Sequence, residues 1–172
     1  MNMEYPTNIE PSEMRIGVVG AGSWGTALAH LLSTKGFAVD LWVFEAEIAE
    51  QIRETRENRV FLPGVRLPEN LVASNDVEQV VAQKPLVLVV VPSHVMRQTA
   101  GRLAGCLDAR SIVVSASKGI ENETHLTMSG VLRQVVPSLG SDRIAVLSGP
   151  SFAKEVARQV PTAVTAASEE RA

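Results

Sequence analysis

A glycine-rich turn between an apolar strand and a helix constrains the fold of this chain more than any other feature. Residues 15–26 read RIGVVGAGSWGT, a strand followed by a G-x-G-x-x-G turn and a helix start. In such a turn the first glycine permits a sharp bend, the second lets a pyrophosphate approach the backbone, and the third lets the helix pack closely on the strand. The free N–H groups of the helix start also favour phosphates. We therefore expect a dinucleotide site formed by Gly20, Ala21, Gly22, Ser23, Trp24 and Gly25, with a plain tight turn as the alternative.

Two residues at the end of the second predicted strand, 38–44, fit the adenosine half of a dinucleotide. Glu45 lies 20 residues beyond Gly25, where a carboxylate can accept hydrogen bonds from ribose hydroxyls. Its charge repels a 2′-phosphate, and the nearest arginine in the sequence, Arg53, is two helical turns away, so NAD is favoured and NADP is the alternative. Phe44 offers an aromatic face to adenine. A solvated glutamate and an ordinary core phenylalanine remain the competing interpretations.

Strands and helices alternate along the rest of the chain. Apolar runs predict strands at 38–44, 71–74, 86–91, 112–115, 144–148 and 162–167, with helical segments between most of them. The continuous run at 86–91, LVLVVV, is typical of a central parallel strand covered on both faces. Segment 58–68 is too rich in Pro and Gly for regular structure. The pattern predicts an α/β fold with a doubly wound, mostly parallel Rossmann-type sheet and a ligand at the carboxyl ends of its strands.

Length and charge narrow the classes of protein. The 172 residues suffice for one domain, which we place at 14–172 behind a disordered extension at 1–13 that contains Pro6 and Pro11. A net charge of −3 argues against nucleic-acid or membrane-surface partners. The longest apolar run is too short to span a bilayer, and residues 1–13 lack the apolar stretch of a signal peptide. We therefore expect a cytoplasmic protein.

Cysteine and histidine usage predicts no metal site. Cys106 is the single cysteine, so an internal disulfide is excluded and a reducing compartment fits. The three histidines, His30, His94 and His125, have no metal-ligand spacing between them. We interpret Cys106 as an inert, partly buried thiol.

A second group of candidate residues follows two later strands. Lys118 stands after the strand at 112–115, where its ammonium suits a substrate phosphate or carbonyl oxygen. Gly149 and Ser151 follow the strand at 144–148 and combine a bare backbone turn with a hydroxyl and helix N–H groups. Both sites fall on the same edge of the predicted sheet, although a lone loop lysine is ordinarily only solvated.

Five segments together resemble the NAD(P)-dependent sn-glycerol-3-phosphate dehydrogenases. They are GAGSWGTALA at 20–29, FLPGVRLP at 61–68, VVPS at 90–93, SKGIE at 117–121, and SGPSFAKEV at 148–156 followed by PTA at 161–163. The resemblance covers about residues 14–167. It implies reversible hydride transfer that interconverts dihydroxyacetone phosphate and sn-glycerol 3-phosphate with NAD or NADP.

The resemblance also assigns roles to single residues. It implies cofactor contacts along residues 20–25 and at Phe44, Pro92, Lys118 and Ala153, and substrate contacts at Lys118, Gly149 and Ser151. In the family the catalytic lysine, a general acid or base, lies in a C-terminal helical domain that these 172 residues do not include. We therefore expect no catalytic residue in this chain and weak or absent turnover by it alone. A homodimer is expected for the complete enzyme.

Two other functions remain open. The chain could be a stand-alone dinucleotide-binding sensor or regulatory module without catalysis. It could also belong to another Rossmann oxidoreductase that acts on a different hydroxy compound.

Overall fold

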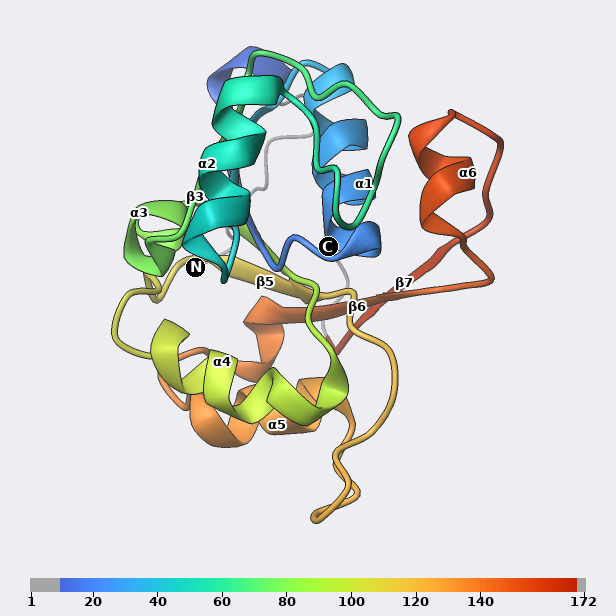
Figure 1. Ribbon diagram of the computed structural model, residues 1–172. Coiled ribbons are helices and arrows are strands. Elements are labelled where there is room, and N and C mark those ends of the chain that lie inside the picture. Colours follow the sequence, from blue (N-terminus) through green and yellow to red (C-terminus); the bar gives the residue numbers. More distant parts are fainter. Residues whose placement is uncertain (1–9, 170–172) are drawn as a thin grey trace.

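A seven-stranded sheet forms the centre of the protein (Figure 1). The computed structural model describes residues 10–169. The sheet has the order β3-β2-β1-β4-β5-β6-β7, and every neighbouring pair is parallel except β6 and β7. Its strands are β1 (Arg15–Val19), β2 (Ala38–Trp42), β3 (Leu71–Ser74), β4 (Leu86–Val89), β5 (Ile112–Ser115), β6 (Ile144–Ser148) and β7 (Thr165–Ser168). This order confirms the predicted doubly wound, mostly parallel Rossmann-type fold.

Helices cover both faces of the sheet. One face carries α1 (Ser23–Thr34) and α2 (Ala46–Thr55), and α6 (Ala153–Ala157) packs beside α1. The other face carries α3 (Val77–Val81), α4 (Met96–Leu103) and α5 (Met128–Val135). Figure 1 shows α1 and α2 above the sheet and α4 and α5 below it. Each layer has its own apolar core against the sheet, which explains the unbroken apolar run of β4.

Several element boundaries differ from the sequence-based expectations. β2 and β4 each end two residues earlier than predicted, because the chain turns away from the sheet there to form the walls of clefts described below. Short 3-10 turns occur at Pro11–Glu13, Ser93–Val95 and Ser141–Arg143. Of the predicted disordered extension, residues 1–9 lie outside the described residues, whereas Pro11–Glu13 form the first of these turns.

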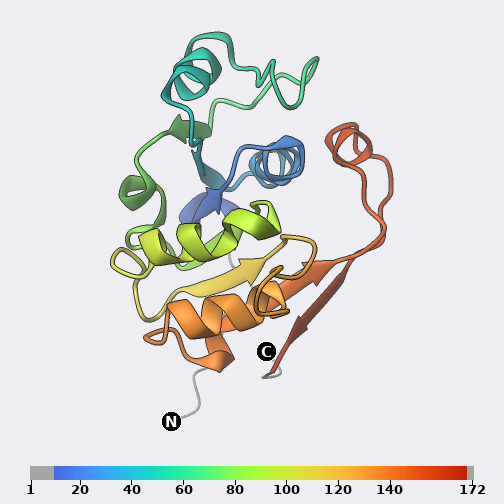
Figure 2. The ribbon, with the colours of Figure 1, turned by 60° about the horizontal axis from the view of Figure 1, so that its bottom comes forward.

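The last strand runs against its neighbour. β7 pairs antiparallel with β6, with Ser148 opposite Thr165, and begins three residues later than predicted (Figure 2). Ser148 is the last residue of β6 and Thr165 is the first residue of β7, so β7 starts at the end of the sheet where β6 stops. The chain therefore enters β7 from the carboxyl end of the sheet.

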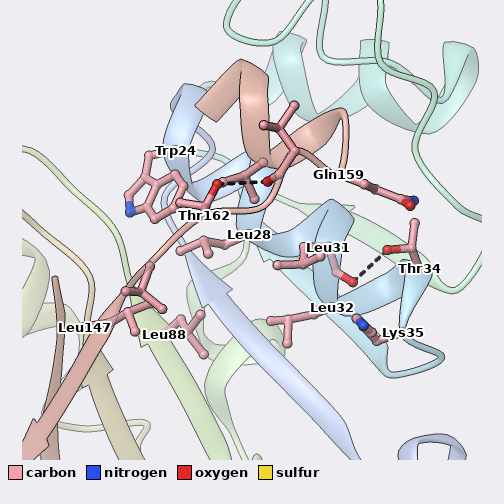
Figure 3. Close-up of a pocket in the computed structure, with 13 residues that line it drawn as sticks. Trp24, Leu28, Leu31, Leu32, Thr34, Lys35, Leu88, Leu147, Gln159 and Thr162 are labelled. Carbon is pink, nitrogen blue, oxygen red and sulfur yellow. Dashed lines mark hydrogen bonds between the residues drawn. The ribbon is translucent and has the colours of Figure 1, made fainter. Parts of the chain in front are cut away.

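An apolar groove of about 610 Å³ lies beside α1 (Figure 3). Leu28, Leu31 and Leu32 of α1 line one side of it. Leu88 and Leu147 line it from the sheet. The remaining wall comes from α6 and the segment that leads to β7.

None of the helices in residues 10–169 has the length and apolar character needed to cross a membrane.

A buried ion network joins β2 to the α3 side of the sheet. Asp40 is 6% exposed in the middle of the strand, and its carboxylate lies 2.8 Å from Arg15 Nη1 and 3.2 Å from Lys84 Nζ. The same ammonium donates to the backbone oxygens of Gln79 and Ala82 at 3.2 and 3.3 Å. The single acid of an otherwise apolar strand is thus neutralised by two cations.

Replacing Asp40 by alanine tests this network. Because Asp40→Ala leaves the buried Lys84 ammonium without a counter-charge, we expect a loss of about 3 kcal/mol in the free energy of unfolding, measured with urea. The control is Glu69→Ala, since the Glu69 carboxylate is 80% exposed and lies 3.7 Å from Arg56 Nε. That variant should stay within about 0.5 kcal/mol of the parent. If both variants lose the same free energy of unfolding, the buried ion pairs of Asp40 do not stabilise the fold more than an exposed ion pair does.

Candidate functional site

The glycine turn brings three backbone segments into contact. Gly20 has φ 112°, and a Cβ added to it would lie 2.3 Å from the Val90 carbonyl oxygen. A Cβ on Gly25 would lie 1.9 Å from the Gly20 carbonyl oxygen. Over Gly22, in contrast, an added Cβ would meet nothing within 4 Å. The first and third glycines are therefore required by packing, while the second faces open space.

The start of α1 offers free hydrogen-bond donors to that space. Gly22 is the N-cap residue and provides no side-chain acceptor. Within the described part of the chain, the amides of Ser23 and Trp24 have no hydrogen-bond acceptor. Open space, free amides and the positive end of a helix dipole together fit a pyrophosphate.

The irregular segment 58–68 holds the turn in place. The Asn58 side chain is fully buried, and its Nδ2 donates to the Ala21 carbonyl oxygen and to Thr26 Oγ1, each at 2.9 Å. Ser23 Oγ donates to the Phe61 carbonyl oxygen at 2.5 Å. Sequence patterns identified this segment only as irregular, because its contacts are to residues far away in the sequence.

Two clefts adjoin at Gly22. The first, which we call the Phe44 cleft, has a volume of about 280 Å³ and lies between the loop after β2 and α4. Six of the predicted site residues line it: Gly20, Ala21, Gly22, Phe44, Glu45 and Pro92. Its other walls include Phe61, Val95, Gln98, Thr99 and Arg102, which sequence patterns did not assign to this half of the site.

The second, which we call the Lys118 cleft, has a volume of about 330 Å³. Eight predicted site residues line it: Gly22, Ser23, Trp24, Gly25, Pro92, Lys118, Ser151 and Ala153. Gly149 does not line it, but its carbonyl oxygen lies 3.4 Å from Lys118 Nζ. The two adjoining clefts thus bring together every residue predicted for the site except Gly149, which lies beside Lys118.

Lys118 presents a free charge to the second cleft. Its side chain is exposed, and Nζ lies 3.5 Å from the Ser151 carbonyl oxygen and 5.9 Å from the centroid of the Trp24 ring. Hydrogen bonds this long are weak, so the ammonium retains donors for an anionic ligand. Helix α6 begins at Ala153, so Ser151 lies in the turn before it, beside Lys118.

The loop that carries Lys118 is fixed on both sides. Ser117 Oγ accepts a hydrogen bond from the Val91 amide at 2.9 Å. The Glu121 carboxylate accepts two hydrogen bonds from Arg97, at 2.8 and 2.7 Å, and one from Thr124 Oγ1. The hydrogen bonds from Arg97, and then from Thr124, lower the pKa of Glu121 from 4.5 to about 2. A flexible lysine side chain therefore stands on a rigid backbone.

One arginine of the Phe44 cleft was not among the predicted site residues. Arg102 of α4 lines the same cleft as Glu45. Arg53, the nearest arginine in the sequence, instead bonds Glu50 and the Ala73 carbonyl oxygen. The last turn of α4 faces the loop after β2, an approach that sequence distance does not reveal.

Other polar residues form no comparable site. No group of three or more His, Cys, Asp or Glu residues is placed to hold a metal ion in residues 10–169. Burial, followed by the Glu78 and Asp76 carboxylates, raises the pKa of the Cys106 thiol, which disfavours a reactive thiolate. The larger groove of Figure 3 is mostly apolar and lacks the glycine turn's amides. The two clefts are therefore the candidate ligand site.

Comparisons with known proteins agree on one family. The family described as the N-terminus of NAD-dependent glycerol-3-phosphate dehydrogenase matches residues 15–172. A glycerol-3-phosphate dehydrogenase (NAD(P)+) of Syntrophobacter fumaroxidans is 56% identical over 155 residues, which are 90% of this chain and 46% of that protein. The chain spans about half the length of the curated relatives it matches.

Solved structures give the same result. The crystal structure of glycerol-3-phosphate dehydrogenase from Coxiella burnetii is similar with a TM-score of 0.85 and 34% identity, over 91% of this chain and 47% of that one. A glycerol-3-phosphate dehydrogenase from Saccharomyces cerevisiae has a TM-score of 0.80 and 29% identity, over 92% of this chain and 48% of that one.

Two glycine substitutions separate folding from phosphate binding. Gly25→Ala should lower the free energy of unfolding by about 1–3 kcal/mol, because its Cβ meets a backbone oxygen that cannot move aside. Gly22→Ala should cost at most about 1 kcal/mol, the loss of a favourable N-cap residue, but weaken NADH binding at least about tenfold. Urea unfolding and calorimetric titration measure the two effects. A Gly22→Ala variant that binds like the parent would contradict a pyrophosphate at this turn.

The low pKa of Glu121 leads us to expect that the folded chain loses stability at acid pH. Its pKa is lower in the folded chain than the ordinary 4.5, so its contribution is complete above that pH and is lost as the pH falls towards about 2. The melting temperature of the parent should therefore fall more steeply across this interval than that of Glu121→Gln, which has no proton to gain. If the melting temperatures of the parent and of Glu121→Gln depend on pH in the same way, Glu121 does not stabilise the loop.

Proposed function

This chain belongs to the NAD-dependent glycerol-3-phosphate dehydrogenase family, as its N-terminal part, and we propose that it supplies the cofactor site and part of the substrate site of such an enzyme. The reaction is the interconversion of dihydroxyacetone phosphate and sn-glycerol 3-phosphate by hydride transfer. The observation that carries the proposal is the open space over Gly22, where free amides face the junction of two clefts.

Each half of the dinucleotide has a cleft of suitable character. The backbone at Gly20–Gly25 binds the pyrophosphate. The Phe44 cleft receives the adenosine, with the Phe44 ring against the base and the Glu45 carboxylate at the ribose hydroxyls. The nicotinamide then enters the Lys118 cleft past Pro92 and Ala153. When bound, the reduced nicotinamide supplies the hydride.

The polar groups of the Lys118 cleft suit the substrate. Lys118 offers a point charge to a phosphate or to a carbonyl oxygen, and Ser151 adds a hydroxyl on the same side. These groups bind and orient the substrate. A ketone that accepts hydride also needs a proton at its oxygen. We assign that step to the lysine expected in the other half of a family member, so these 172 residues alone should turn over substrate slowly or not at all.

The groove of Figure 3 suits the remainder of such an enzyme. It is lined by leucines of α1 and of the sheet, of which Leu31, Leu32 and Leu147 are half-buried, and curated relatives are about twice as long as this chain. We propose that the C-terminal helical half covers this groove. We also propose a homodimer for the complete enzyme and a cytoplasmic location, the latter supported by the single unpaired Cys106.

The cooperative binding of cofactor and substrate tests this function. Dihydroxyacetone phosphate should tighten NADH binding to the chain at least about fivefold, measured by NADH fluorescence, because both ligands meet in the Lys118 cleft. Lys118→Met should abolish this effect. The control Lys154→Met removes a nearby exposed lysine that lines neither cleft and should behave like the parent.

The outcomes separate the competing functions. Absence of NADH binding by the folded chain would refute the dinucleotide site. NADH binding without any response to dihydroxyacetone phosphate would favour a sensor module or an oxidoreductase with another substrate. If Lys118→Met responds like the parent, Lys118 is only a solvated charge.

A further inference from the structure

Arg102 holds an unpaired positive charge at the wall of the Phe44 cleft. Its guanidinium carbon lies 5.4 Å from the centroid of the Phe44 ring. No carboxylate lies within ion-pair distance of Arg102 in residues 10–169. A guanidinium that contacts only an aromatic face keeps its N–H donors available for an anion.

The platform beneath Arg102 is rigid. Trp42 is 4% exposed, and its Nε1 donates to the Asn75 carbonyl oxygen at 3.1 Å. The Trp42 and Phe44 rings meet edge to face at 5.9 Å between centroids, and this contact supports one side of the otherwise exposed Phe44 ring. The neighbouring Leu103 is fully buried and anchors the last turn of α4. Arg102 is thus supported from both sides of the cleft.

Opposite charges line this cleft from different elements. Of the residues that line it, Glu45 and Arg102 are the charged ones, the first from the start of α2 and the second from the end of α4. A carboxylate alone would reject a phosphate on the ribose, whereas an arginine offers a planar set of donors that binds phosphate bidentately.

We propose that Arg102 is the residue of the Phe44 cleft that binds the 2′-phosphate when NADP takes the place of NAD. This inference rests on the proposed dinucleotide site and identifies the residue that sets its cofactor preference. The Glu45 carboxylate accepts hydrogen bonds from the ribose hydroxyls of NAD, and Arg102 offsets the repulsion between this carboxylate and the 2′-phosphate of NADP.

Nucleotide fragments without the nicotinamide test the role of Arg102 alone. We would titrate the parent chain and Arg102→Gln with ADP-ribose and with 2′-phospho-ADP-ribose by calorimetry. Arg102→Gln should weaken the binding of 2′-phospho-ADP-ribose about tenfold or more and change that of ADP-ribose less than about twofold. Arg102→Lys, which keeps the charge but loses the planar donors, should fall between the parent and Arg102→Gln.

A matched control removes an arginine at the opposite edge of the sheet. Arg110 is 88% exposed in the loop that enters β5, so Arg110→Gln should bind both fragments like the parent. Added salt should weaken the binding of 2′-phospho-ADP-ribose more for the parent than for Arg102→Gln, because the contact that Arg102 adds is ionic.

Three results would overturn the inference. Equal weakening of both fragments would show that Arg102 only covers the adenine. If Arg102→Gln changes the binding of neither fragment, the Arg102 side chain is only solvated. If the folded parent binds neither fragment, the dinucleotide site itself is wrong and the role of Arg102 falls with it. Matching melting temperatures for all variants exclude a folding defect as the cause of lost binding.

Discussion

The contact between the bare backbones of β1, α1 and β4 is the constraint on which the rest of this structure depends. No side chain separates Gly20 from the carbonyl of Val90, or Gly25 from the carbonyl of Gly20. The first turn of α1 therefore sits directly over the carboxyl ends of β1 and β4, the two strands between which the order of the sheet reverses. Both clefts open from this point, and they share Gly22 as a common wall.

Local sequence patterns predicted much of this architecture and the core of the site. The glycine turn, the bounds of β3, β5 and β6, and the strand-end positions of Lys118 and Ser151 all follow from residues that are close in the sequence. Arg102 and Asn58 could not be found in this way, because each acts on a segment that is distant in the sequence. The antiparallel direction of β7 did not follow from local patterns either, because it depends on the path of the irregular residues 158–164 that follow α6.

The Lys118 loop combines an exposed charge with a fixed backbone. Ser117 ties it to the end of β4, and Glu121 ties it to Arg97 on α4. The long Lys118 side chain contacts only carbonyl oxygens and the Trp24 ring, at distances that allow easy exchange. The ammonium can therefore follow a ligand while the cleft keeps its shape, and reorganisation of the loop adds little to the cost of binding.

The hydrogen bonds of Asn58 have a consequence for how this protein tolerates sequence change. Surface connections without helix or strand ordinarily accept insertions and deletions. Here the Asn58 side chain and the Phe61 carbonyl oxygen form hydrogen bonds with the glycine turn, and Leu62 is fully buried. An insertion within residues 58–62 would displace Asn58, Phe61 or Leu62 and break these contacts. Variation in length should therefore be tolerated best around Pro63 and Gly64, where the backbone has no such buried anchor and the Gly64 amide donates to the Glu57 side chain.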